Sequence, residues 1–195
     1  MIVGHYATAL LPWSRAPRAP LWLYLVCAQA LDFLWLGLAA AGVEAPSPSS
    51  ILDVTFANLR VQMVVSHDAL PVLGWAALTA GVVLAVTRDG RVALWCGALV
   101  VGHLLCDLLS GFGHTLCGAG SPAIGLDLYG RAPRLALVIE AVFGAACVLA
   151  FAASERRQGR PLTIRRQAAL HAVFVGGALA WLPTATTPLG RWLGG

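Results

Sequence analysis

The chain has 195 residues, of which 58% are hydrophobic and only 11% are charged, and its formal net charge is +4. A soluble globular domain carries about 25% charged residues, so this composition excludes a disordered chain, a nucleic-acid-binding protein and an ordinary soluble enzyme. We expect an all-α polytopic helical bundle that forms one integral membrane domain over residues 1–195, with the lipid bilayer as its surroundings. The sequence leaves the oligomeric state open.

Five stretches are long and apolar enough, or nearly so, to form transmembrane helices, which need about 20 mostly apolar residues each. In chain order they are Leu21–Val43, Ala69–Thr87, Val92–Ser110, Leu135–Ala153 and the shorter Ala168–Pro183. The apolar segment Met1–Pro12 is too short to cross. Two arrangements are open for it: it lies flat at the membrane interface, or it forms a half-helix that dips into the bundle.

Arginine sets the predicted orientation of the bundle. The 13 basic residues are all Arg, and five of them lie in the loop 154–167. The positive-inside rule places this loop in the cytoplasm, and alternation of the spans then places the N-terminus and the turn at 88–91 on the same side. The loops 44–66 and 111–134 face outward. Arg without Lys, together with much Ala, Gly and Leu, is typical of GC-rich bacteria, so we predict a multi-pass membrane protein of bacterial origin.

Ionisable residues interrupt the apolar stretches, although each costs at least about 2.5–3.5 kcal/mol at a helix centre. They are Asp32, His103, Asp107 and Glu140 within the spans, and His67 and Asp68 directly before the second span. Counted along straight helices from their outer ends, most lie in the outer half of the bundle, while Asp32 lies about 16 Å deep. This distribution predicts a polar pocket that opens outward.

The sharpest local pattern is His103 followed four residues later by Asp107. Residues four apart share one helix face, so this imidazole and this carboxylate can point to one place, as ligands of zinc or a similar metal. The alternative is a hydrogen-bonded pair without a metal. His114 and Cys117 lie in the outer loop, and we interpret them as an ordinary loop pair in preference to extra metal ligands. We interpret His171 as a residue at the membrane interface.

Five short motifs occur in an order and spacing that resemble a known family. They are Gly4-His5-Tyr6-Ala7, Leu31-Asp32, Ser66-His67, Gly102-His103 with Asp107, and Ser121-Pro122 with Gly125 to Tyr129. Over residues 1–155 the chain resembles the bacterial inner-membrane metal-dependent hydrolases, some of them LexA-regulated, and their uncharacterised membrane-protein relatives. The resemblance implies a divalent-metal site, with zinc as the best candidate, whose ligands are His5, Asp32, His67, His103 and Asp107.

The chain departs from the family pattern at three places. Asp68 follows His67 where the family has Ser, Gln62 and Met63 occupy positions where it has a further His, and Asp127 stands where relatives have Gly. The departures imply a site of lower coordination, a different metal or a loss of catalysis, unless Asp68 or Asp127 supplies a base or a replacement ligand.

Two functions are compatible with these patterns. In the first, the chain is a metal-dependent hydrolase that cleaves an ester or phosphoester of a lipid-like substrate with metal-activated water, and Asp68 or Glu140 is the general base. In the second, it is a non-catalytic membrane protein, a transporter or scaffold subunit, whose intramembrane His and Asp residues are structural or handle protons. Its span glycines would then permit close helix packing. Convergence of the five predicted ligands within a few ångströms would favour the metal site.

Overall fold

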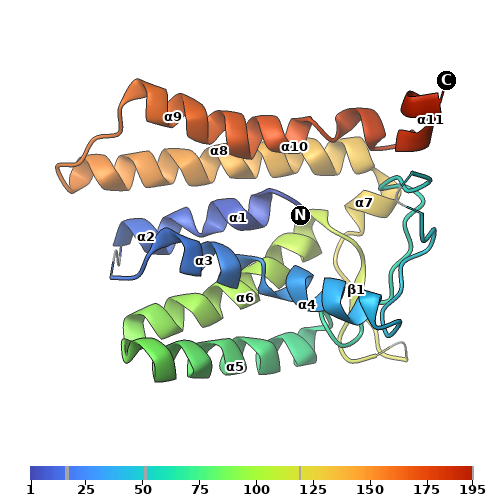
Figure 1. The fold of residues 1–195 in the computed structure, drawn as a ribbon, viewed down its shortest axis with the longest axis horizontal. Coiled ribbons are helices and arrows are strands. Elements are labelled where there is room, and N and C mark those ends of the chain that lie inside the picture. Colours follow the sequence, from blue (N-terminus) through green and yellow to red (C-terminus); the bar gives the residue numbers. More distant parts are fainter. Residues whose placement is uncertain (16–17, 51, 119, 195) are drawn as a thin grey trace.

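Three helices in the described chain are long and apolar enough to cross a membrane. In the computed structural model, which describes residues 1–15, 18–50, 52–118 and 120–194, they are α5 (Ala69–Thr87), α6 (Gly90–Ser110) and α8 (Pro133–Arg157). Each coincides with a predicted span to within four residues at either end. The prediction of an all-α bundle of membrane-like helices is therefore confirmed, and Figure 1 shows α5 and α6 running antiparallel beside each other.

The first predicted span is broken in the middle. It consists of α3 (Leu21–Ala28) and α4 (Ala30–Ala40), which are bent by 54° at Gln29 and give a fourth candidate span if they are taken together. A break of this kind removes helical partners from the carbonyl groups at the end of the first helix. The bend therefore leaves acceptors in the bundle interior, just before Asp32.

A fifth transmembrane helix, predicted at Ala168–Pro183, is not confirmed. The chain there forms three consecutive helical pieces and a short 3₁₀ turn: α9 (Ile164–His171), the π-helical η1 (Ala172–Gly176), α10 (Gly177–Leu179) and η2 (Leu182–Thr184). Proline cannot donate a backbone hydrogen bond, so the proline within η2 helps to end the run. The pieces α9, η1 and α10 pack along α8 (Figure 1).

The N-terminal segment forms two short helices inside the bundle. These helices, α1 (Gly4–Thr8) and α2 (Leu10–Arg15), lie against α8, with α1 also contacting α6 (Figure 1). His5 and Leu10 are each 1% exposed. Of the two arrangements open for Met1–Pro12, the structure therefore has the half-helix that enters the bundle.

The segments predicted to be cytoplasmic meet at one end of the bundle. Arg18 pairs with Asp89 in the α5–α6 turn, with Nη1 and Oδ2 3.4 Å apart, and the Gln158 side chain donates to the Ser14 carbonyl at 2.6 Å. Backbone N–H groups at the start of α6, first that of Val92, donate to the Asp89 carboxylate and lower its pKa. These contacts connect the N-terminal segment to the α5–α6 turn and to the end of α8, all at the same end of the bundle.

The opposite end carries the long loops and the small secondary elements. These are the antiparallel hairpin β1 (His114–Thr115) and β2 (Ala123–Ile124), the short helix α7 (Leu128–Arg131), and the C-terminal α11 (Leu189–Gly194). An isolated bridge between Ser47 and Arg60 closes the 44–66 loop. This end covers the ionisable residues described below.

Two span glycines lie where helices approach most closely. A Cβ added at Gly97 of α6 would lie 3.1 Å from the Ala76 carbonyl oxygen of α5, and one at Gly144 of α8 would lie 3.0 Å from that of Phe174. At four other span glycines such a Cβ would have no heavy atom of the described chain within 4 Å other than the adjacent backbone of its own helix: Gly74, Gly81, Gly102 and Gly176. Close packing therefore depends on particular glycines and not on glycine content in general.

We predict that Gly97→Val lowers the free energy of unfolding by about 1–3 kcal/mol, because the new side chain forces α5 and α6 apart. Denaturation of the purified protein in detergent measures this loss. Gly81→Val, on the exposed face of α5, is the matched control and should change stability by less than about 0.5 kcal/mol. Equal losses of stability in both variants would show that Gly97 is not a special site of close packing between α5 and α6.

Candidate metal centre

His103 and Asp107 of α6 point into the bundle at the loop-bearing end. They are 1% and 6% exposed, and His103 Nε2 lies 3.5 Å from Asp107 Oδ2. The helix places both side chains on one face because they are one turn apart. The shared face predicted from their spacing is therefore present in the structure, and it is buried among the surrounding helices.

His5 joins this pair from α1. Its ring stacks on that of His103, with centroids 3.5 Å apart and planes 7° from parallel, and its Nε2 lies 3.2 Å from Asp107 Oδ1. The Met1 amino group donates to the same carboxylate oxygen and lies 2.7 Å from His5 Nε2. The two oxygens of Asp107 thus face different groups.

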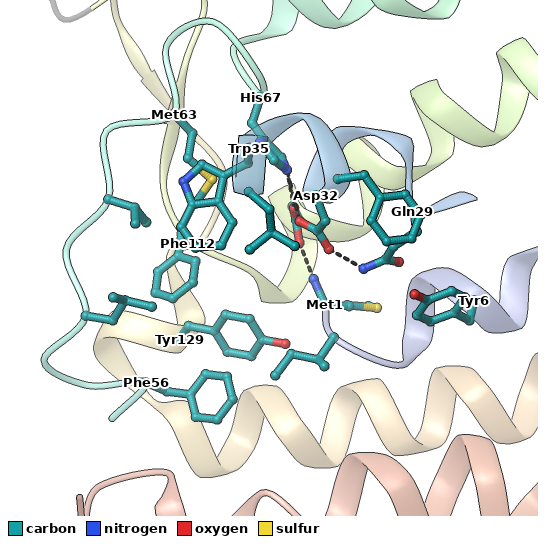
Figure 2. Close-up of a pocket in the computed structure, with 16 residues that line it drawn as sticks. Met1, Tyr6, Gln29, Asp32, Trp35, Phe56, Met63, His67, Phe112 and Tyr129 are labelled. Carbon is teal, nitrogen blue, oxygen red and sulfur yellow. Dashed lines mark hydrogen bonds and ion pairs between the residues drawn. The ribbon is translucent and has the colours of Figure 1, made fainter. Parts of the chain in front are cut away.

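Asp32 and His67 complete the cluster from the other side. Asp32 Oδ1 lies 3.4 Å from His67 Nε2 and 3.6 Å from His103 Nε2, and its other oxygen accepts a hydrogen bond from Gln29. Figure 2 shows Asp32 and His67 facing each other at the head of the pocket. A straight-helix count places Asp32 too deep for this contact, and the bend at Gln29 turns α4 so that the contact forms.

All five residues predicted as metal ligands therefore meet. They form two groups, His5 with His103 and Asp107, and Asp32 with His67 and His103, and within each group the candidate ligand atoms lie within 4.8 Å of one another. His103 belongs to both groups. Imidazole and carboxylate ligands at such distances could hold a metal ion.

Hydrogen bonds on the far side of two imidazoles decide which nitrogen faces the cluster. His103 Nδ1 lies 2.8 Å from the Ala28 carbonyl at the end of α3, and a carbonyl only accepts, so this nitrogen carries the proton. The Ser66 hydroxyl donates to Glu44 at 2.6 Å and therefore accepts from His67 Nδ1 at 2.8 Å. In both rings the lone pair of Nε2 is left facing the carboxylates, which is the tautomer that metal-ligating histidines adopt.

These buried nitrogens lack partners within the described part of the chain. The Nε2 atoms of His67, His103 and His114 are all buried without a hydrogen bond. Burial lowers the pKa of His67, which favours the neutral imidazole that binds metals. Unpaired polar atoms are costly in an apolar interior, so their gathering beside two carboxylates indicates a cation site.

Three predicted acidic residues have other partners. Asp68 accepts from the Thr115 hydroxyl and from two backbone N–H groups of the outer loop. Glu140 accepts from the Gly4 N–H at 2.8 Å and the Tyr129 hydroxyl at 2.7 Å, as well as from the Val3 N–H. Asp127 accepts from the Gly113 N–H. None of the three belongs to either group of ligands described above.

Sequence reasoning missed Glu44 altogether and ranked His114 as an ordinary loop residue. Glu44 is 3% exposed and accepts from Ser66, which in turn holds His67. His114 is 4% exposed and lies beside the cluster. Both are in loops, where no helical period marks a buried position. The only available signal was the scarcity of charged residues, which makes an acid such as Glu44 in an apolar chain unusual.

A cavity of about 310 Å³ opens beside the cluster (Figure 2). Asp32, His67 and Asp107 line one part of it, and apolar side chains such as Trp35 and Phe56 line most of the rest. A second cavity of about 470 Å³ shares five apolar residues with the first: Ile2, Trp35, Leu36, Phe56 and Leu59. The cluster is thus reached through largely apolar space.

Comparisons with protein-family models, curated proteins and solved structures find no match to this chain. The resemblance to membrane-bound hydrolases therefore stays a prediction from short motifs, and the geometry of the cluster is the observation that bears on function.

We predict that Glu140→Ala destabilises the protein by at least about 2 kcal/mol, because it leaves the buried N–H groups at the start of α1 without their acceptor. Unfolding in detergent measures the loss. Tyr129→Phe removes only one of the three hydrogen bonds and should cost less. If the two variants lose the same stability, Glu140 does not hold α1 in place.

Proposed function

We propose that the chain is an integral-membrane, metal-dependent hydrolase. One observation carries this proposal. The Nε2 atoms of His67 and His103 have no hydrogen-bond partner in the described chain, and they face Asp32 and Asp107 inside an apolar bundle. A divalent cation would satisfy these nitrogens and offset the two negative charges together. In the alternative interpretation, a histidine–carboxylate cluster without metal, the neutral imidazoles leave these two Nε2 atoms without a hydrogen-bond partner. The metal-free cluster is therefore the less favourable interpretation.

The spacing of the donors supports zinc. Two ligands bound about 2.0–2.1 Å from a tetrahedral zinc ion are about 3.3 Å apart. The distances are 3.4 Å from Asp32 to His67, 3.6 Å from Asp32 to His103 and 3.5 Å from Asp107 to His103. Small side-chain rotations would therefore bring His67, His103 and Asp107 into a zinc coordination sphere. The fourth position would remain for a water molecule beside Asp32, with His5 available beside Asp107.

Zinc held by these residues would lower the pKa of a coordinated water to about 7 and so would supply a nucleophile at neutral pH. We assign the acceptance of its proton to Asp32, because 29% of its side chain is exposed, compared with 9% of that of Asp107. Asp68 and Glu140, the predicted general bases, already accept three hydrogen bonds each from other segments. In this proposal they hold the outer loop and α1 in position.

The cavity supports a lipid-like substrate. Its polar part is formed by the cluster, and apolar side chains continue from it into the second cavity. An ester or phosphoester group could lie at the cluster while an apolar chain fills the remaining space. We therefore propose an ester or phosphoester of a lipid as the substrate class.

Elemental analysis of the protein purified in detergent tests the metal centre. We predict at least one divalent first-row ion per chain, and turnover of fluorogenic ester or phosphoester lipids in mixed micelles. His103→Ala should lose both, since it removes the ligand common to the two groups. His171→Ala is the matched control, because His171 bonds to the Gln167 carbonyl of its own helix, and it should keep both.

Wild-type protein without metal, or an unchanged metal content in His103→Ala, would overturn the proposal. Metal binding without turnover of any such lipid would favour the non-catalytic alternative, a transporter or scaffold subunit.

We also propose that the protein lies in the bacterial inner membrane with its N-terminus in the cytoplasm and α9 to α10 as a short fifth crossing. The positive-inside rule supports this orientation, because the turn at 88–91 and the loop 154–167 lie at the end of the bundle opposite the cluster. The cluster and its cavity would then open toward the outer leaflet.

Cysteine labelling tests the orientation. Cys117 is exposed at the loop-bearing end and the other four cysteines are buried. We predict that a membrane-impermeant maleimide labels Cys117 in cells with a permeabilised outer membrane. With Cys117→Ser as background, Arg157→Cys should react only after the inner membrane is opened. The reverse pattern would invert the orientation.

A further inference from the structure

His114 is buried although it lies in an outer loop. It begins the hairpin strand β1 and is only 4% exposed. Its ring stacks on that of His67, with centroids 5.4 Å apart and planes 8° from parallel. Its Nε2 lies 3.8 Å from Asp107 Oδ2 and has no hydrogen-bond partner in the described ranges. This nitrogen therefore faces the same carboxylate oxygen as His103.

Asp68 ties the hairpin to the turn that carries His67. Its carboxylate accepts from the Thr115 N–H at 3.0 Å, from the Thr115 hydroxyl at 2.7 Å and from the Gly118 N–H. The Leu70 N–H donates to the Leu116 carbonyl at 3.0 Å and adds a backbone tie. Four hydrogen bonds thus fix the residues that follow His114, directly beside His67.

We propose that His114 is a further ligand of the metal ion and that Asp68 is a positioning residue for it. This inference rests on the proposed metal centre and adds a ligand from a fifth segment of the chain. The Nε2 atoms of His67, His103 and His114 all lie within 4.0 Å of Asp107 Oδ2, so the three imidazoles could share one ion with this oxygen, and the hairpin would cover the centre. The cavity remains the open approach, so a lipid would reach the ion past Asp32.

Metal titration and the visible spectrum of the cobalt-loaded protein test this ligand. Loss of a residue that only orients a ligand costs about 10–100-fold in metal affinity. We expect His114→Ala to weaken metal binding by more than about 100-fold. We also expect it to change the cobalt absorption bands, because these bands report which residues bind the ion. Asp68→Asn should weaken zinc binding by about 10–100-fold and keep the bands, because His114 still binds.

His114→Gln, which keeps a polar side chain of similar size, guards against a folding defect in the alanine variant and should show the same changed bands. His171→Ala should leave affinity and spectrum as in the wild type. If His114→Ala and His114→Gln bind zinc and cobalt like the wild type while His103→Ala does not, His114 is not a ligand, although the metal centre stands. If the wild-type protein binds neither ion, the proposed function fails together with this inference.

Discussion

The buried carboxylate of Asp107 sets the constraint on which the rest of the centre depends. A carboxylate in an apolar bundle costs several kcal/mol unless partners stabilise its charge. One oxygen faces His5 and the Met1 amino group, and the other faces His103 and His114. The Met1 ammonium group offsets the charge of Asp107. The second acid, Asp32, however, faces only imidazoles and the Gln29 amide in the described chain. Neutral imidazoles offset a negative charge only in part, so the arrangement favours an additional cation between the acids and the rings.

The residues that orient the imidazoles of His67 and His103 belong to a helix break and to a buried loop, both of which depart from regular helix packing. The interruption between α3 and α4 frees the Ala28 carbonyl, and this carbonyl orients His103. Glu44 is drawn inside from a loop, where it holds Ser66 and through it His67. A helix break and a buried loop acid would both be unfavourable in an ordinary bundle. Here each one fixes the direction of an imidazole, as partners beyond the direct ligands do in metalloproteins.

Regular geometry predicts only part of the centre. The short motifs that carry the resemblance predict the other ligands, His5, Asp32 and His67. The spacing of His103 and Asp107 is enough to place both on one helix face, because the helix period is fixed. Asp32 meets them only through a bend that apolar composition does not reveal. Glu44 and His114 belong to loops, whose paths depend on contacts with distant residues and carry no period in the sequence. Long apolar helices are predictable from composition, whereas the partners of the ligands require the folded chain.

The attachment of α1 to Glu140 has a consequence for how the protein is made. The cluster residues lie between positions 5 and 114, but the acceptor that holds the start of α1 lies on α8. During synthesis the helices form in chain order, so His5 can contact His103 and Asp107 of α6 early. The start of α1, however, gains its Glu140 acceptor only once α8 is in place. A ribosome that stalls before residue 140 would leave a nascent chain with an incomplete centre. Completion of the cluster around α1 is therefore coupled to completion of the bundle.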